Sequence, residues 1–550
     1  MLEGSLDPPP SPFHPRELQA RIDAALERVP ATWGVLVHST TLGDLAIREP
    51  DAALVPASCV KLFTAMAALH ARDVGPRRTL DTTARVVPDA AGPGWSTATL
   101  AVRPSGDPTL TGDALDALVA RAALSSRIPI ERIVAASLEG DEWCDEGAPG
   151  TWEVGDLRHA WAAPPSRACV DGNAECCAAS PRDFFAREPP PSPRSAFVRR
   201  VEAALVKAMG TSARTDIARI VRSPRSSPPT SACGDASSAR SSSPANGVDA
   251  SLAKRASSPI VVHRSPPVSR LARLALEDSD NLVAEQLLRF CAHAAAERDS
   301  ARWLTRWTSA FVRPYCPRSS EAPRRVRLAD GSGLSRRNLA PPRALAAIVL
   351  AALGGRAAEA AAEAETAEAN RDGGEMDAEE DEAAEDRENF RRRPFAAFLD
   401  ALAVGGRTGT LAGRARLIGE EASAEVRGEG EGVRGFAAVR GGSRRWSVRA
   451  KSGSMSGVAS LTGYFERHPD PALGDVVFAV VANNHIGNGN GDGDGDGDDG
   501  GGARDARCLR DAVDEVVALV ALARTKTEDE NGEPGEDAED EDEPRVNILR

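Results

Sequence analysis

The amino-acid sequence predicts an α/β fold in which helices flank an antiparallel sheet. Three observations support this class: two strand-like segments followed by a loop and a helix near the beginning, three consecutive strand-like segments followed by a helix near the end, and a long intervening region of different composition. A chain of 550 residues is also too long for one compact core, so more than one domain is expected.

The first elements follow one another closely. Apolar residues recur at helical spacing over residues 18–26, and the apolar run Trp33–His38 is typical of a buried strand. A turn precedes a second short strand at Leu45–Ile47. The segment Leu62–His70 is rich in Leu, Ala and Met and contains neither Gly nor Pro, which predicts a helix. Strand, strand, loop and helix in this order begin an α/β sandwich.

The central region changes character twice. Short strand-like pieces at Thr83–Val87 and Thr99–Val102 accompany a helical stretch at Asp113–Ala123. Ser, Pro and Arg then dominate, which predicts a low-complexity linker over residues 222–255. Helical periodicity returns at Val268–Leu276 and Leu282–Phe290.

The last third contains the remaining sheet. The run 357–386 is almost entirely Ala, Glu and Asp, and its composition fits a charged helix and a disordered insert equally well. Amphipathic periodicity then returns over Phe395–Leu402. Three strands of one antiparallel sheet are predicted, of which the last is almost wholly apolar and therefore central, and a closing helix follows; these elements are Trp446–Ala450, Ala459–Phe465, Val476–Ala482 and Asp511–Leu522.

Charge and cysteine usage exclude several classes of protein. The net charge of −14 argues against a nucleic-acid partner, since phosphate binding needs clustered Lys and Arg. The nine cysteines form no CxxC pair, and no His spacing suits zinc, so neither a disulfide framework, a metal site nor a cofactor is predicted. The Gly-Asp tract at 491–499 resembles a calcium loop superficially, but Ala503 stands where a bidentate Glu is needed, which favours a flexible surface insert.

No segment predicts membrane attachment or secretion. The first ten residues lack a basic region followed by an apolar run, so no signal peptide is recognised. The apolar stretches Ala344–Leu353 and Val516–Ala523 are too short to span a bilayer, so no transmembrane segment is expected.

Three short motifs carry the predicted chemistry: Ser58-Cys-Val-Lys61, Ser279-Asp-Asn281 and Lys451-Ser-Gly453. Ser and Lys three residues apart at the start of a helix share one face, which holds the amine near the hydroxyl. Taken alone, each motif has an ordinary structural explanation, namely a helix cap with an exposed Lys, a capping turn, or a strand end. SxxK even recurs at Ser251–Lys254, where no helix is predicted.

The scarcity of lysine strengthens the catalytic interpretation. A serine hydroxyl needs an adjacent base, and a lysine can serve as that base only if burial and a neighbouring positive charge lower its pKa. Arg cannot take this role because it is not deprotonated in proteins. The chain prefers Arg throughout, and its only lysines are Lys61, Lys207, Lys254, Lys451 and Lys526.

Together and in this order, the motifs resemble the signature of the penicilloyl serine transferases. The surrounding sequence is similar to the D-alanyl-D-alanine carboxypeptidase/endopeptidase family, the class C low-molecular-mass penicillin-binding proteins. Further blocks that resemble this family are Pro56–Thr64, Ser105–Leu110, Trp152–Asn173, His263–Val268, Ser279–Leu288, Asp330–Ser335, Gly409–Leu411 and Gly457–Tyr464. One departure is Ser452, where the family usually has Thr.

The resemblance implies a β-lactamase/transpeptidase-like antiparallel sheet flanked by helices and split by an inserted, mostly β domain. On this basis we expect a catalytic domain at 15–81 plus 256–524 that carries inserts at 355–390 and 486–503. The remaining segments are expected to be a disordered amino terminus at 1–14, inserted domains at 82–221, the Ser/Pro-rich linker at 222–255, and an acidic disordered tail at 525–550.

The resemblance also implies a role for each site residue. Ser58 is expected to attack the carbonyl between two terminal D-alanines, and Lys61 to accept its proton. Ser279 is expected to pass a proton to the leaving amine, and Asn281 to bind Lys61 and the substrate amide. The segment Lys451-Ser452-Gly453-Ser454 is expected to bind the substrate, with its carboxylate at Lys451 and Ser452 and its oxyanion at the backbone N–H groups of Ser58 and Ser454.

The implied activity is that of a serine-type D-Ala-D-Ala carboxypeptidase that acts on peptidoglycan stem peptides and is inhibited by penicillin. Endopeptidase action, a β-lactamase or esterase on the same scaffold, and an inactive peptidoglycan-binding protein are the alternatives. The sequence does not distinguish oligomeric states. The resemblance implies an extracytoplasmic location, with a plastid as the alternative compartment suggested by the inserts.

Overall fold

A computed structural model provides the structure of the chain. It describes residues 14–71, 73–88, 97–126, 128–135, 147–177, 192–209, 219–220, 259–372, 393–417, 446–485 and 500–524. The predicted linker at 222–255, the second SxxK copy, the Gly-Asp tract, the tail at 525–550 and all but the last residue of the segment 1–14 lie outside the described residues.

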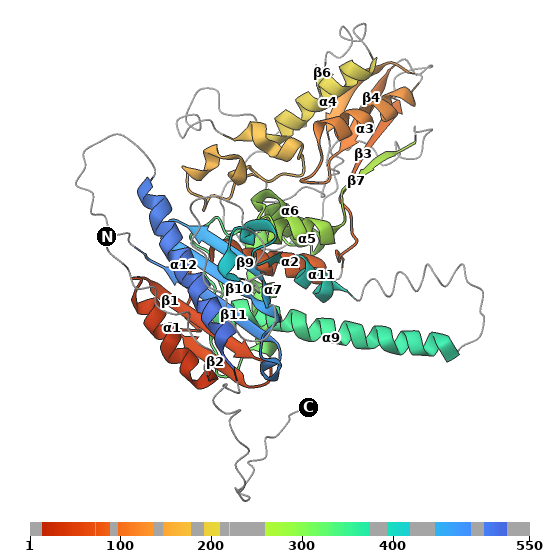
Figure 1. Ribbon diagram of the computed structural model, residues 1–550. Coiled ribbons are helices and arrows are strands. Elements are labelled where there is room, and N and C mark those ends of the chain that lie inside the picture. Colours follow the sequence, from red (N-terminus) through yellow and green to blue (C-terminus); the bar gives the residue numbers. More distant parts are fainter. Residues whose placement is uncertain are drawn as a thin grey trace, which may run out of the picture.

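A six-stranded antiparallel sheet forms the centre of the larger part of the molecule (Figure 1), with the strand order β2-β1-β11-β10-β9-β8. Its strands are β1 (Thr32–Ser39), β2 (Gly43–Arg48), β8 (Ala403–Val404), β9 (Ser447–Met455), β10 (Val458–Arg467) and β11 (Val476–Asn483). The predicted fold class is confirmed by this sheet and the helices on it.

The strand β11 is central, as its apolar sequence predicts, and all eight of its residues are buried. Alternate side chains enter different cores because successive residues of a strand point to opposite faces. Val477, Ala479 and Val481 belong to one core, whereas Phe478 and Val480 belong to the other. The sheet is therefore covered on both faces.

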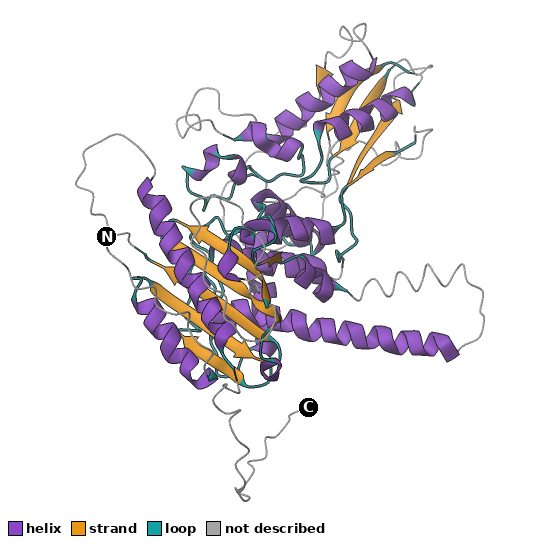
Figure 2. Cartoon of the chain, viewed as in Figure 1, coloured by secondary structure: helices purple, strands orange, loops and turns teal. Residues whose placement is uncertain are grey.

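Helices form a layer on each side of this sheet (Figure 2). On one face lie α1 (Leu18–Glu27) and α12 (Gly500–Leu522). On the other face lie α2 (Val60–His70), α5 (Val268–Leu276), α6 (Asn281–Ala294), α7 (Ser300–Val312), α8 (Ala322–Arg325), α9 (Pro342–Asp372) and α11 (Pro394–Asp400).

Short 3-10 helices occur in the connections. They are η1 (Pro15–Glu17), η2 (Ala57–Cys59), η3 (Asp156–Arg158), η4 (Ala160–Ala162), η5 (Asp171–Cys176), η9 (Arg313–Tyr315), η10 (Gly409–Leu411), η11 (Ala415–Leu417) and η12 (Pro471–Leu473). Of these, η2 carries the predicted nucleophile.

A second sheet is built largely from the segment between the first two motifs. Its order is β6-β5-β4-β3-β7, with β3 antiparallel to β4 and β7 and with β5 parallel to β4 and β6. The strands are β3 (Asp81–Pro88), β4 (Ala98–Arg103), β5 (Ile130–Ala135), β6 (Arg219–Ile220) and β7 (Val261–Arg264). Two helices, α3 (Gly112–Leu124) and α4 (Pro193–Met209), share one apolar core with it.

Two helices are longer than the sequence predicts. The Ala/Glu/Asp run 357–386 fits two interpretations by composition, and the structure continues α9 through it as far as Asp372, beyond which residues 373–392 are outside the described part. The closing helix, predicted from Asp511, begins at Gly500. Neither extension is visible as amphipathic periodicity, which is why the pattern did not predict it.

The helix α9 also bears on membrane attachment. By length and composition, Pro342–Ala364 is the one stretch among the described helices that could cross a membrane. Half of its most apolar window is buried inside the protein, and Leu345 and Ile348 are fully buried in the core on the sheet's second face. Packing within the core therefore accounts for its apolar composition.

Candidate active site

The predicted nucleophile Ser58 lies in η2, immediately before α2. Two hydrogen bonds from side chains to backbone oxygens fasten this segment to the sheet. Ser460 Oγ donates to Pro56 O at 2.7 Å, and Cys59 Sγ donates to Lys451 O at 3.2 Å. Ala57 has a φ of +45°, a left-handed conformation that costs energy in a residue with a side chain. Ser58 thus lies on a strained turn that β9 and β10 hold in place.

The Lys61 amine is completely buried and has three partners. Lys61 Nζ lies 2.9 Å from Ser58 Oγ, 2.6 Å from Asn281 Oδ1 and 2.6 Å from the backbone oxygen of Ser332. A neutral amine has two N–H groups and one lone pair. If Asn281 and Ser332 accept the two N–H groups, the lone pair points at the Ser58 hydroxyl, which is the geometry that a general base requires.

The surroundings of Lys61 suit this role electrostatically. Burial and then the charge of Lys451 lower the pKa of Lys61 to about 7, against the opposing effect of Asp330, Glu285 and Asp280. A lysine with this pKa is substantially neutral at physiological pH. The two lysines predicted to share the site are therefore electrostatically linked.

The second motif begins α6. Asp280 caps the helix by accepting a hydrogen bond from Val283 N, which places Asn281 at the first helical position. Asn281 Nδ2 donates to Trp161 O at 2.9 Å, so the amide connects Lys61 to the segment that follows η3. Ser279 is half-buried with a φ of +64°, and none of the described residues makes a hydrogen bond with its hydroxyl. The structure therefore brings Asn281 onto Lys61 but leaves the Ser279 side chain unengaged.

The third motif lies on β9, which pairs with β10 over its whole length. Lys451 and Gly453 are buried, whereas Ser452 is half-buried and Ser454 is exposed. A Cβ on Gly453 would lie 2.9 Å from Ser58 N and 2.7 Å from Pro56 O, so only glycine allows the strand to approach the nucleophile this closely. This contact brings the Gly453 backbone next to Ser58.

The two polar side chains of the third motif have different partners. Lys451 Nζ donates to Ser452 O at 2.7 Å, and Ser452 Oγ donates to Thr410 Oγ1 at 2.8 Å. Burial lowers the pKa of Lys451 to about 8, with a further lowering by Arg414 and an opposing effect of Cys59. Lys451 therefore keeps its proton to a higher pH than Lys61 does.

Four groups around the site were not predicted as functional: the Ser332 carbonyl, Glu285, Thr410 and the Trp161 carbonyl. Each lies in a sequence block that resembles the family, and this resemblance is the feature of the sequence that could have identified it as functional. Two of them act through the backbone, and a backbone carbonyl has no residue type by which a sequence pattern could identify it.

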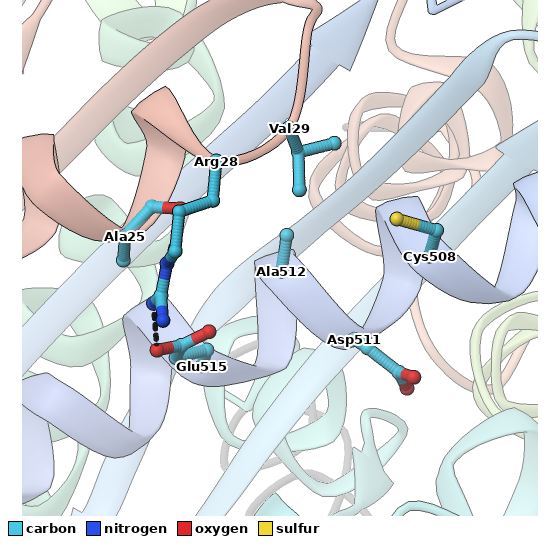
Figure 3. Close-up of a pocket in the computed structure, with 7 residues that line it drawn as sticks. All are labelled: Ala25, Arg28, Val29, Cys508, Asp511, Ala512 and Glu515. Carbon is cyan, nitrogen blue, oxygen red and sulfur yellow. Dashed lines mark hydrogen bonds and ion pairs between the residues drawn. The ribbon is translucent and has the colours of Figure 1, made fainter. Parts of the chain in front are cut away.

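Two hollows of the surface lie outside this constellation. One hollow of about 420 Å³ is lined by residues of α1 and α12 and of the turn after α1. Figure 3 shows Arg28 pointing toward Glu515 there, and the two side chains form an ion pair. A second hollow of similar volume is lined by Arg336, Ser456 and His485 among others. Neither lining contains Ser58 or Lys61.

Metal ligands are not grouped in the described part of the chain, where no cluster of three or more His, Cys, Asp or Glu could hold an ion. The expectation of a metal-independent and cofactor-independent site stays a prediction. The functional groups that the structure brings together are a hydroxyl, two buried amines and backbone amides.

Comparisons with known proteins place this geometry in context. Penicillin binding protein 4 from Haemophilus influenzae aligns with a TM-score of 0.53 and 17% identity, over 89% of this chain and 98% of that one. The same protein complexed with a beta-lactam aligns with a TM-score of 0.52 and 16% identity, over 89% and 98% of the two chains. At such identities the likeness establishes the fold. No curated protein sequence matches the chain.

A family model gives the more specific result. The model described as D-Ala-D-Ala carboxypeptidase 3 (S13) matches residues 18–196 and 244–364, which is more than half of the chain. The match includes Ser58, Lys61, Ser279 and Asn281, and it ends before β9. The chain is therefore a serine peptidase that belongs to the D-Ala-D-Ala carboxypeptidase 3 (S13) family.

Proposed function

We propose that the protein is a serine-type D-Ala-D-Ala carboxypeptidase that acts on peptidoglycan stem peptides through an acyl-enzyme at Ser58. One observation carries the proposal: the buried Lys61 amine lies 2.9 Å from Ser58 Oγ while two further acceptors bind its N–H groups. A lysine held in this way is a base directed at a hydroxyl.

Acylation begins when Ser58 Oγ attacks the carbonyl carbon between the two terminal D-alanines and its proton passes to Lys61. The backbone N–H groups of Ser58 and Ser454 stabilise the oxyanion of the tetrahedral intermediate. When the intermediate collapses, the C–N bond breaks and the leaving amine takes a proton through Ser279. Two observations support this role. Ser279 has a left-handed backbone directly before the start of α6, and its hydroxyl has no hydrogen-bond partner among the described residues.

The substrate's terminal carboxylate binds at the third motif. Lys451 supplies the positive charge, and Ser452 supplies a hydroxyl that already belongs to a hydrogen-bonded pair with Thr410. The serine hydroxyl replaces the family's usual threonine hydroxyl at this position. Asn281 orients the substrate amide in addition to Lys61. Water then hydrolyses the ester at Ser58 and releases the shortened peptide.

The test is intact-mass analysis after incubation with a labelled penicillin, comparing the wild type with Ser58→Ala. A beta-lactam is a suitable probe because a protein of the same fold has been crystallised with one. We expect one covalent adduct on the wild type and none on Ser58→Ala. An adduct of equal yield on Ser58→Ala would contradict the assignment of the nucleophile.

Two turnover assays separate the alternatives on the same scaffold. We expect release of D-Ala from a stem pentapeptide and slow release of bound penicillin. Rapid penicillin turnover without D-Ala release would identify a β-lactamase or an esterase instead. If neither substrate is turned over and no adduct forms, the protein is an inactive peptidoglycan-binding protein. Cleavage of cross-linked peptides would add endopeptidase activity.

The proposed substrate also determines the proposed location. Peptidoglycan lies outside the cytoplasmic membrane, so we propose an extracytoplasmic site of action, which membership of the S13 family supports. Localisation of a tagged full-length chain by cell fractionation tests this proposal, and recovery in the cytoplasm alone would contradict it.

A further inference from the structure

Glu285 is a fully buried carboxylate next to the site, and the mechanism above gives it no role. It lies on α6 four residues after Asn281, and residues four apart lie one above the other on the same helix face. Glu285 is thus one turn below the amide that contacts Lys61.

The contacts of Glu285 are with the loop that follows α8. Its Oε1 atom accepts hydrogen bonds from the backbone N–H groups of Gly331 at 2.9 Å and Ser332 at 2.8 Å. The backbone oxygen of Ser332 in turn accepts the hydrogen bond from Lys61 Nζ at 2.6 Å. Ser332 is therefore the single residue that links Glu285 to Lys61 by hydrogen bonds.

Close packing on both sides holds the loop at Gly331–Gly333 in place. A Cβ on Gly331 would lie 2.9 Å from Leu288 Cβ on α6, and a Cβ on Gly333 would lie 2.0 Å from Ala57 O beside the nucleophile. Thr64 on α2 also donates to Gly331 O at 2.7 Å. The loop is held between α6 on one side and the segment that carries Ser58 and Lys61 on the other.

We propose that Glu285 is a positioning residue for the general base, a proposal that rests on the proposed function. Its carboxylate holds the Gly331–Ser332 backbone so that the Ser332 carbonyl accepts one N–H of Lys61. With Asn281 accepting the other N–H, the lone pair of the neutral amine is left for the Ser58 hydroxyl. α6 therefore orients Lys61 twice, once directly and once through the loop.

The charge of Glu285 has a second, measurable effect on the same amine. The charged and titratable groups that face Lys61 are Lys451 from β9, the Cys59 thiol from η2, Asp330 from the loop, and Asp280 and Glu285 from α6. Glu285 opposes the lowering of the Lys61 pKa. Removing the charge of Glu285 therefore lowers the pKa of Lys61 further. The acid limb, which is the part of the pH profile where the acylation rate rises as Lys61 loses its proton, then moves to lower pH.

Arg289 provides a matched control. It pairs with Glu285 at 2.6 Å, and both side chains are buried, so replacing Glu285 alone would strand a buried cation. The comparison is therefore between Arg289→Met, in which the Glu285 carboxylate keeps its two backbone N–H donors, and the double variant Glu285→Leu/Arg289→Met. Both lack the ion pair, and only the double variant also lacks the carboxylate and its acceptor oxygens.

The measurement is the second-order rate of acylation by a labelled penicillin across pH, on variants shown to be folded by circular dichroism. We expect Arg289→Met to acylate at close to the wild-type rate, with an acid limb that does not move to lower pH. We expect the double variant to lose roughly tenfold to a hundredfold at its optimum and to show an acid limb at lower pH. Equal rates and equal limbs in the two variants would overturn the proposal.

A second readout is independent of catalysis. With only five lysines in the chain, ¹⁵N-lysine NMR can follow the titration of the Lys61 amine directly. The pKa of Lys61 is expected to be lower in the double variant than in Arg289→Met, and equal values would count against the proposal. Failure of the proposed acyl-enzyme has a different signature, because the wild type itself would then form no adduct at Ser58.

Discussion

Two walls of the active site each contribute one fully buried lysine: Lys61 lies on the helical wall, formed by α2 and α6, and Lys451 lies on the strand wall, formed by β9. The surroundings of the two amines differ. On the helical wall, Lys61 Nζ has three hydrogen-bond partners from three separate segments. On the strand wall, Lys451 Nζ has one acceptor within the described part of the chain, the backbone oxygen of the neighbouring Ser452. Burial lowers the pKa of both amines.

This difference indicates how one residue type can serve two purposes. An amine whose N–H groups are already bound offers its lone pair, as a base must, whereas an amine with N–H groups to spare offers them to an anion. The order of titration agrees with these roles. Burial and then the charge of Lys451 lower the pKa of Lys61 to about 7, whereas burial lowers the pKa of Lys451 to about 8, so Lys61 loses its proton first.

The largest expected effect comes from exchanging each lysine for arginine. Lys61→Arg keeps a positive charge but cannot accept a proton, so we expect acylation by penicillin to fall roughly 1,000-fold or more. Lys451→Arg keeps the charge that a carboxylate needs, and we expect a loss of only about tenfold. Similar losses in the two variants, measured by stopped-flow acylation, would remove the distinction between the walls.

A steric change on the helical wall should affect stability as well as rate. Gly333 has a φ of +88°, and a methyl group there would lie 2.0 Å from Ala57 O. We expect Gly333→Ala to lower the free energy of unfolding by about 2–4 kcal/mol, because it combines backbone strain with overpacking. Urea unfolding measures this change. Gly354→Ala is the control, since a Cβ at Gly354 meets nothing within 4 Å.

The pH dependence of the reaction tests the link between the lysines. Acylation needs neutral Lys61 and protonated Lys451, so the wild-type rate with a D-Ala-D-Ala peptide should rise through about pH 7 and fall above about pH 8. Lys451→Met removes the charge that lowers the pKa of Lys61, so the rising limb should move to higher pH. The activity at pH 7 should fall roughly tenfold to a hundredfold. An unmoved rising limb would show that the amines do not interact.

The smallest effect is expected between the two helices that pack on the second sheet. Asp116 on α3 pairs with Arg200 at 3.3 Å and Lys207 at 2.9 Å on α4, and both basic side chains are solvent-exposed to a considerable extent. Asp116→Asn should cost about 1 kcal/mol or less and leave acylation unchanged. A changed acylation rate in a folded variant would mean that this region acts on the site.

The sequence predicted those parts that depend on residue type and spacing. The SxxK spacing placed Ser58 beside Lys61, and the unbroken apolar run at Val476–Ala482 identified the central strand, because burial on both faces leaves no polar alternation. The Ala/Glu-rich part of α9 was ambiguous, since such composition has no apolar stripe to reveal the helix period.

The parts of the site that were missed depend on the path of the backbone. The Ser332 carbonyl contacts Lys61 only because Gly331 and Gly333 let the loop pass between α6 and η2. Glu285 reads in the sequence as one more polar residue on a helix, and its partners are 46 and 47 residues away along the chain. Neither contact leaves a pattern of neighbouring residues by which the sequence could predict it.

The pairing of β1 with β11 has a consequence for biosynthesis. Thr32 faces Asn483 in this pair, so the strand that fills the middle of the sheet is separated from its neighbour by most of the chain. Contacts between such distant segments slow folding because a long loop must close first. A nascent chain that already carries the nucleophile must therefore wait until β9, β10 and β11 have left the ribosome. Until then it lacks the strand that we propose to bind the substrate's carboxylate, so we expect an incomplete polypeptide to be inactive.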